Sequence, residues 1–260
     1  MTYASFLVLY VVPPTVALGA AVVRWRSGVR LRELLAGIGM LVVLAVVYTT
    51  PWDNYLVASE TWTYPEERTW GIRLGWVPLE EYCFFVLQTV LTGLWVGLLL
   101  RDGSRRAGRG GYSARVIGAA AFLSIAGASA TAVATGPESL RYLGLILAWA
   151  APPIALQVWF GADLLLGRWR TVLPGFAVPT IYFSVADTVA IGAGTWHITE
   201  RTSTGVLLPG GLPAEEFVFF LVTNLLVTFG LVLFLVPEGR ERARALVAGL
   251  RRRAAEVGRA

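Results

Sequence analysis

Two short acidic motifs, about 135 residues apart, are the parts of this sequence best suited to chemistry. Residues 78–81 read Pro-Leu-Glu-Glu and residues 213–216 read Pro-Ala-Glu-Glu, and both precede a long apolar run. The same pattern also makes a good helix start, because proline presets φ and carboxylates favour the positive end of the helix dipole. Carboxyl groups next to hydrocarbon are costly, however, so their repetition at equivalent places indicates a functional role.

The two glutamates of each motif must point in different directions, because consecutive helix positions diverge by about 100°. Each second glutamate shares a face with residues three, four and seven positions later, namely Phe84, Phe85 and Gln88 after Glu81, and Phe219, Phe220 and Thr223 after Glu216. Aromatic surroundings and a neighbouring carboxyl group raise the pKa of a carboxylic acid, which keeps a proton available at neutral pH. The helix dipole opposes this rise, and the sequence leaves open which glutamate is the acid and which is the base.

Asp53 and Asp187 also occupy equivalent places, each near the end of an apolar run. Either could be an interfacial helix cap or a member of the acidic cluster, and the repetition favours the cluster. The candidate catalytic residues are therefore Glu80, Glu81, Glu215, Glu216, Asp53 and Asp187. The candidate substrate-binding residues are Phe84, Phe85, Gln88, Phe219, Phe220, Trp62 and Trp196, although tryptophans at these depths also form interfacial belts.

Composition places these residues in a membrane protein. Of the 260 residues 56% are hydrophobic and only 15% are charged, whereas a water-soluble domain carries about 25% charged residues. Seven apolar runs are long enough to span a bilayer, near 3–23, 34–52, 79–100, 115–135, 142–161, 172–192 and 213–236. The sequence thus predicts an all-α integral membrane protein with seven transmembrane helices.

The basic residues exclude several classes of function. The chain has no lysine, so chemistry that needs a Schiff-base lysine is excluded, including that of a retinal photoreceptor. It has one histidine and one cysteine, so neither a His-rich metal site nor an internal disulfide is expected. The excess of positive charge lies at the ends of apolar runs and in the tail, which argues for membrane anchoring and against nucleic-acid binding.

The distribution of arginines also predicts orientation. Eighteen of the 22 arginines fall in one set of connections and the tail, and only Arg68, Arg73, Arg141 and Arg201 fall on the opposite side. The rich side should be cytoplasmic, which puts the N-terminus outside and the C-terminus in the cytoplasm of a multi-pass cell-membrane protein. The acidic motifs then lie at the outer ends of their helices.

An ordered series of matches shows that the chain contains an internal repeat. Tyr3 and Pro13-Pro14 match Tyr142 and Pro152-Pro153, and the aspartates, tryptophans and acidic motifs follow with a nearly constant offset. Two parallel three-helix repeats joined by a linker helix, a 3+1+3 arrangement, would place both acidic motifs at one depth. We expect the first repeat at 1–110, the linker span at 111–140, the second repeat at 141–237 and a basic tail helix at 238–260.

The doubled acidic motif with its trailing phenylalanines, the repeat, and the segment Pro51-Trp52-Asp53-Asn54-Tyr55 together resemble the membrane-embedded lycopene cyclase family. The resemblance is to the fused form, in which two three-span polypeptides are joined, and it covers about residues 1–236. The second half departs from the pattern at Phe217, which stands where the first half has Tyr82, and at 185–186, where Val-Ala replaces Pro-Trp.

The resemblance implies conversion of the acyclic ends of lycopene, or of a related carotenoid taken from the bilayer, into β-ionone rings. Such a reaction is an acid–base isomerisation without net redox, so no cofactor and no metal are expected. Membrane lipids and other enzymes of carotenoid biosynthesis are the expected partners. Formation of an ε ring, an elongated substrate, one or two rings per molecule, and the oligomeric state stay open, as do the alternatives of a 3+1+3 small-molecule transporter and a non-catalytic carotenoid- or quinone-binding protein.

Overall fold

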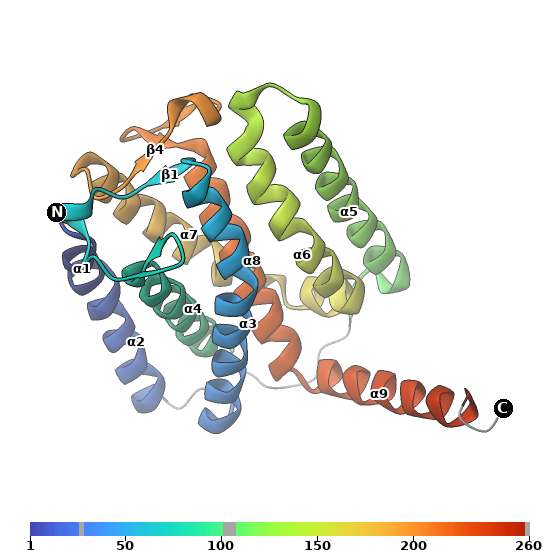
Figure 1. The fold of residues 1–260 in the computed structure, drawn as a ribbon. Helices are drawn as coiled ribbons and strands as arrows, with labels where there is room; N and C mark the ends of the chain where they lie inside the picture. The colour runs from blue at the N-terminus through green and yellow to red at the C-terminus, as the bar shows by residue number, and fades with distance from the viewer. Residues whose placement is uncertain (26–28, 101–107, 258–260) are drawn as a thin grey trace.

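The computed structural model describes residues 1–25, 29–100 and 108–257, and in them seven helices are long and apolar enough to cross a membrane (Figure 1). The spans are Tyr3–Arg24, Leu31–Ala58, Leu79–Leu99, Gly111–Thr135, Glu138–Gly167, Trp169–Gly192 and Ala214–Leu235. The prediction of an all-α membrane protein with seven spans is confirmed. Most of the Gly- and Arg-rich connection between the third and fourth spans lies outside the described residues.

The first span combines α1 (Tyr3–Phe6), a π-helical turn (Leu7–Val11) and α2 (Val12–Trp25). Its wide turn directly precedes Pro13 and Pro14, whose rings and missing N–H groups disturb the regular helical hydrogen bonds. The remaining long helices are α3 (Leu31–Ala58), α4 (Leu79–Leu99), α5 (Gly111–Thr135), α6 (Arg141–Gly167), α7 (Trp169–Gly192), α8 (Ala214–Leu235) and α9 (Pro237–Val257). Three single 3₁₀ turns complete the helical elements of the described residues, at Glu66–Arg68, Glu138–Leu140 and Glu200–Thr202.

Helices α4 and α8, which begin with the acidic motifs, form the centre of the bundle. In their most apolar stretches 61% and 56% of the residues are buried, whereas the figure for α5 is 11%. Helix α5 packs along α6 at one edge (Figure 1), where a Cβ on Gly118 would lie 2.6 Å from Val158. That close approach agrees with the small residues of α5, which favour tight helix packing.

The middle of the bundle contains buried polar side chains that bond one another. Thr92 of α4 donates a hydrogen bond of 2.7 Å to Asn224 of α8, and both side chains are fully buried. Gln88 and Thr223 are joined by a second bond of 2.8 Å between the same helices. Neutral polar side chains that bond each other can be buried at small cost, so these contacts join α4 and α8 without burying a charge.

Short strands close the end of the bundle that carries the acidic motifs. Strand β1 (Trp62–Thr63) pairs antiparallel with β4 (His197–Ile198), so segments from the two halves of the chain lie side by side (Figure 1). Two hairpins lead directly into α4 and α8, formed by β2 (Arg73–Leu74) with β3 (Val77–Pro78) and by β5 (Leu207–Leu208) with β6 (Leu212–Pro213). The first turn contains Gly75 at φ 69°, a conformation that favours glycine.

Residues at equivalent positions in the two expected repeats contact each other in two places. Thr63 pairs with His197 between β1 and β4, and Gln88 bonds Thr223 between α4 and α8. Such contacts are what a twofold axis between the halves would produce. The 3+1+3 arrangement and its boundaries stay a prediction that these contacts favour.

The Arg-rich tail forms a helix, α9, which leaves the bundle at the end opposite the strands (Figure 1). Its first turns are tied to the bundle by ion pairs of 2.7 Å between Arg240 and Glu33 and between Arg242 and Asp163, and by a third of 2.9 Å between Glu238 and Arg168. The pair between Arg242 and Asp163 is bidentate, since both terminal nitrogens of the guanidinium donate to the carboxylate.

Orientation is the first testable prediction. Since α9 and the strands lie at opposite ends of the bundle, a reporter fused after Ala260 should be cytoplasmic, and a tag inserted between Glu66 and Gly71 should be accessible from outside. Protease protection in sealed vesicles measures both, with the untagged chain as control. The reverse accessibility at both points would overturn the arginine-based orientation.

Candidate active site

Glu81 lies in the first turn of α4, which starts directly after Pro78. The proline has φ −61° and an extended ψ, so it ends strand β3 and presets the entry into the helix. The Glu81 side chain is 4% exposed and accepts two hydrogen bonds at one carboxyl oxygen, from the hydroxyl of Tyr3 at 2.5 Å and from that of Tyr64 at 2.9 Å. A buried carboxyl group is thus held by two neutral donors.

Glu216 has an equivalent environment at the start of α8. Its side chain is also 4% exposed, and it accepts a short hydrogen bond from the hydroxyl of Tyr142, which is fully buried. Tyr142 is the repeat counterpart of Tyr3. The second tyrosine contact has no counterpart, because the position that corresponds to Tyr64 is occupied by Ile198.

Both glutamates line one small cavity of about 20 Å³ near the strand-covered end of the bundle. This volume has room for about one water molecule. The other lining residues are mainly aromatic and come from both halves of the chain: Tyr3, Phe6, Trp62, Tyr64, Phe84, Asp187, Trp196, Phe219 and Phe220. Three carboxyl groups and several aromatic rings therefore surround one small buried site.

Asp187 joins the glutamates in this cavity and is 1% exposed. One of its oxygens accepts a hydrogen bond of 3.0 Å from the indole N–H of Trp196, and the other has no partner among the described residues. Its counterpart Asp53 is fully buried, does not line the cavity, and has no hydrogen-bond partner for either oxygen within the described part of the chain.

The alternative that the two aspartates cap helix ends is wrong. Helix α3 continues five residues beyond Asp53, and α7 continues five residues beyond Asp187. The expected end of the second span, at residue 52, was therefore too early. Pro51 lies on an exposed face inside α3, and the helix continues past it into a turn that packs on the bundle through the buried Leu56.

Glu80 and Glu215 face away from the cavity, as the helix geometry predicted. Both are fully buried, and each binds the backbone of the preceding loop. Glu80 accepts a bond of 2.5 Å from the backbone N–H of Trp70, and Glu215 accepts one of 2.6 Å from that of Thr204. These carboxyl groups hold the loops that cover the site.

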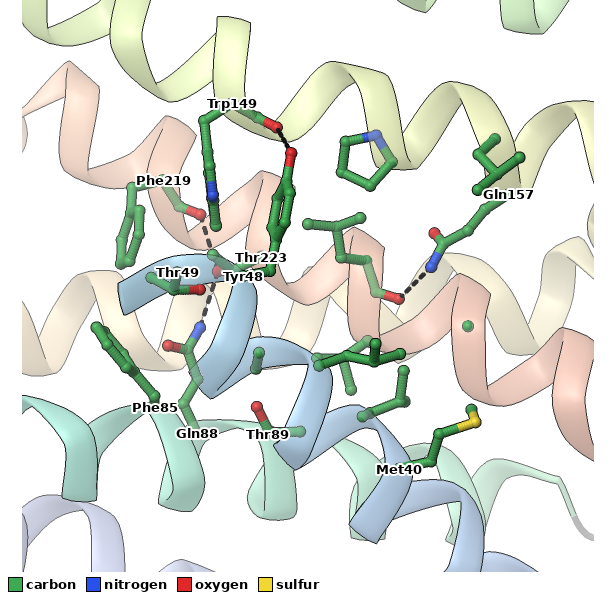
Figure 2. A pocket seen from close by; sticks show the side chains of 18 residues that line it. Met40, Tyr48, Thr49, Phe85, Gln88, Thr89, Trp149, Gln157, Phe219 and Thr223 are labelled. Atoms are coloured by element: carbon green, nitrogen blue, oxygen red, sulfur yellow. Dashed lines mark hydrogen bonds between the residues drawn. The ribbon is translucent and has the colours of Figure 1, made fainter. Parts of the chain in front are cut away.

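The predicted substrate-binding residues divide between two cavities. Trp62, Trp196, Phe84, Phe219 and Phe220 line the small cavity. The remaining two predicted substrate-binding residues, Phe85 and Gln88, instead line a larger apolar cavity between α3, α4, α6 and α8, shown in Figure 2. Phe219 lines both cavities.

The tyrosines at the site were missed as site residues. Tyr3 and Tyr142 were visible as a matched pair in the repeat, which is a signal of a shared role, but Tyr64 follows strand β1 and has no counterpart. Burial, and next the charge of Glu81, raise the pKa of Tyr64 well above its ordinary value of 10.0. Tyr64 therefore stays a neutral hydrogen-bond donor at physiological pH.

Among the described residues, the candidate carboxyl groups have no positively charged partner. In the described ranges, none of the six candidate carboxyl groups forms an ion pair with an arginine. Their partners are hydroxyl, indole and backbone N–H groups. Such a cluster stabilises a positive charge that develops nearby, because no fixed cation competes for the carboxyl groups.

Comparison with known proteins identifies the relatives of this chain. The family model described as lycopene cyclase matches residues 1–98 and 141–234, leaving out the stretch that contains α5. A protein of Halobacterium salinarum named lycopene beta-cyclase is 42% identical over 239 residues, which cover 90% of this chain and 95% of that protein. No solved structure matches the chain significantly.

Fungal relatives are longer proteins. The bifunctional lycopene cyclase/phytoene synthase of Podospora anserina is 39% identical over 212 residues, and that of Gibberella fujikuroi is 37% identical over 239 residues. The matches cover 76% and 88% of this chain but only 35% and 39% of the fungal proteins. With a family model that spans both acidic motifs and a relative matched over nearly its whole length, the chain belongs to the lycopene cyclase family.

Proposed function

We propose that this protein is a membrane enzyme of carotenoid biosynthesis that converts the acyclic ends of lycopene into β-ionone rings, with Glu81 and Glu216 as the acid–base pair. The observation that carries the proposal is that both glutamates line one buried cavity together with aromatic rings. The family and the printed name of the Halobacterium relative support the substrate and the product.

The reaction needs one proton to enter and one to leave. One glutamic acid protonates C2 of the end group, which leaves a tertiary cation at C1. The C5–C6 double bond attacks C1 to close the ring, and the positive charge moves to C5. The other glutamate, as a carboxylate, removes the proton from C6, and the new C5–C6 double bond completes the β-ionone ring.

The cluster of buried carboxyl groups explains how the protein keeps a proton ready. Glu81, Glu216, Asp53 and Asp187 are all buried without an arginine partner among the described residues, and several charges so placed would repel one another strongly. The cluster therefore holds protons as a unit. Since the base gains a proton while the acid loses one, transfer through Asp187 restores the starting state.

Aromatic rings protect the cation. Phe84, Phe220 and Trp196 present ring faces or edges around the cavity, and a cation over a ring face gains about 0.5–2 kcal/mol per ring. The cavity has room for about one water, so few water molecules can intercept the cation. Because the reaction has no net redox step, these residues suffice without a cofactor or a metal.

The lipid bilayer supplies the substrate, since a carotenoid dissolves in hydrocarbon and the protein is almost entirely made of spans. The strand-covered end that holds the site faces outside in this proposal, and the basic tail helix lies at the cytoplasmic surface. Association with other enzymes of the pathway is supported by the fungal relatives, whose names join a cyclase to a phytoene synthase in one chain.

Glutamine replacement tests the acid–base pair. Glu81→Gln and Glu216→Gln keep shape and hydrogen bonding but remove the transferable proton, so each should lower ring formation by about 10²–10⁴-fold in lycopene-making cells. Glu80→Gln and Glu215→Gln are matched controls one position away, which keep an acceptor for the loop N–H and should retain most activity. Pigment extracts separated by chromatography measure lycopene and its ring products.

Protein level in the membrane must be measured alongside. Near-normal ring formation by the Glu81→Gln/Glu216→Gln double variant would refute the assignment of the pair. If the Glu81→Gln and Glu216→Gln proteins are instead lost from the membrane, the motif serves as a helix start.

Alkaline unfolding tests the environment of Tyr64. The neutral form is favoured in the folded state, so its contribution to stability is complete below the ordinary pKa of 10.0 and is lost as pH rises towards the higher pKa of the folded state. Tyr64→Phe should cost about 1–3 kcal/mol at pH 8 through the lost hydrogen bond to Glu81. The cost should shrink above pH 10, as thermal unfolding of the solubilised protein measures. An unchanged difference between the two proteins across this range would contradict the assigned environment.

A further inference from the structure

A cavity of about 410 Å³ lies between α3, α4, α6 and α8, next to the acidic site (Figure 2). Its walls are mainly apolar, with Leu41, Ala45, Phe85, Pro153, Leu226 and Val227 among them. From Met40 to Thr49 its α3 wall is roughly 14 Å long, at 1.5 Å per helical residue. The cavity is thus a long apolar space parallel to a membrane-spanning helix.

The polar side chains in this cavity are largely engaged within the protein. The hydroxyl of Tyr48 donates to the carbonyl of Trp149 at 2.9 Å, the amide of Gln157 donates to the carbonyl of Leu226 at 3.0 Å, and Gln88 is bonded to Thr223 (Figure 2). These side chains therefore spend their N–H and O–H donors on the protein itself. Within the described residues, the indole N–H of Trp149 and one amide oxygen of Gln157 have no partner, and the rest of the lining suits an apolar ligand.

One side of the cavity opens on the lipid-facing surface between α3 and α6. Leu44 and Tyr48 of α3 are 55% and 46% exposed, and Leu156 of α6 is 64% exposed. Exposed apolar side chains on spanning helices contact lipid tails. A molecule dissolved in the bilayer can therefore enter from the side, without passing through water.

The inner end of the cavity is separated from the glutamates by Phe219. This side chain lines both cavities and is 3% exposed. Its ring lies edge-on to Trp62 at 5.6 Å and stacks with Trp52 at 6.0 Å. The acidic cavity alone holds only about one water, so the end of a larger ligand reaches Glu81 and Glu216 only if the Phe219 ring turns aside.

The space that the repeat relates to this cavity is filled. Phe183 stands 134 residues after Thr49, the same offset that relates Asp187 to Asp53. Phe183 is fully buried and stacks with Phe220 at 5.7 Å, where its small counterpart Thr49 leaves the α3 side open. The local geometry is otherwise preserved, because Tyr182 donates to the carbonyl of Tyr10 just as Tyr48 donates to that of Trp149.

A second exchange has the same effect. Trp95 of α4 corresponds to Gly230 of α8 at the offset of 135 residues that relates the two acidic motifs. Gly230 lines the open cavity, whereas the Trp95 indole lies in the space that the repeat relates to that cavity. The indole donates a hydrogen bond of 2.8 Å to the carbonyl of Pro174. Two bulky side chains, Phe183 from the second half and Trp95 from the first, thus stand where the open cavity has the small residues Thr49 and Gly230.

We propose that the open cavity holds the polyene chain of the substrate, which enters between α3 and α6 and passes its acyclic end by Phe219 to the glutamates. Because the equivalent cavity is filled by Phe183 and Trp95, the protein holds one end of the carotenoid at a time. A second ring then needs release and re-entry in the opposite direction. This inference rests on the proposed function and adds to it the path and the order of binding.

Filling the cavity tests the path. Thr49→Phe copies the residue found in the other half, and Ala45→Phe fills a second position of the same wall. Each should reduce ring formation in lycopene-making cells to near background. Thr131→Phe, an equal change on the exposed face of α5, is the matched control and should keep normal activity. Protein level and elution profile of the solubilised protein show that each variant is folded.

Lycopene retention separates this inference from the proposed chemistry. The filling substitutions are combined with Glu81→Gln/Glu216→Gln, and the lycopene that copurifies is measured by absorbance per mole of protein. The double glutamine protein should retain lycopene, and the added Thr49→Phe or Ala45→Phe should remove it. If the glutamine variant still forms rings while the filling variants lose lycopene, the acid–base assignment fails and the cavity assignment holds.

Normal ring formation or normal lycopene retention in folded Thr49→Phe and Ala45→Phe proteins would overturn the cavity assignment.

The order of binding has its own test in a time course with membranes and added lycopene. A one-ring product should accumulate first, and a larger excess of lycopene should raise its share. Two-ring product without any free one-ring product, at every lycopene concentration, would show that both ends are processed in a single encounter.

Discussion

The burial of four carboxyl groups close together inside a membrane protein is the constraint on which the rest of this structure depends. A charge in hydrocarbon is costly, and arginines do not offset it among the described residues. The protein instead gives Glu81, Glu216 and Asp187 neutral donors, the hydroxyls of Tyr3, Tyr64 and Tyr142 and the indole of Trp196. The fourth, Asp53, is buried without a hydrogen-bond partner among the described residues. Neutral donors leave a proton free to move, whereas a salt bridge would fix the charge.

The elements near the site follow from this constraint. Prolines start α4 and α8 abruptly, so that the second glutamate of each motif points into the bundle while the first binds the loop above. The strand pair β1–β4 brings Trp62 and Tyr64 across the top of the cavity. The loops are thus part of the site, because they both cover the carboxyl groups and donate hydrogen bonds to them.

Much of this could be predicted from the sequence, because the repeat marks equivalent residues and helical spacing fixes their faces. The seven spans, the separate directions of Glu80 and Glu81, and the aromatic lining all follow from these two patterns. The position of Asp53 inside a helix could not be predicted, because Pro51 and Trp52 resemble the end of a span. Helix α3 continues past them because the following turn packs on the bundle. Tyr64 was missed because it lies in a loop that a hydropathy pattern does not position.

Most hydrogen-bond partners of Glu81, Glu216 and Asp187 come from the same half of the chain as the carboxyl group itself, and the exception is the indole of Trp62, which reaches Glu216 from the first half. Tyr3 and Tyr64 bind Glu81, Tyr142 binds Glu216, and Trp196 binds Asp187. Contacts between the halves use neutral amides, hydroxyls and rings, such as Gln88 with Thr223. Each half can therefore enter the bilayer during synthesis with its glutamate already hydrogen-bonded, and docking of the two inserted halves need not move any charge through lipid.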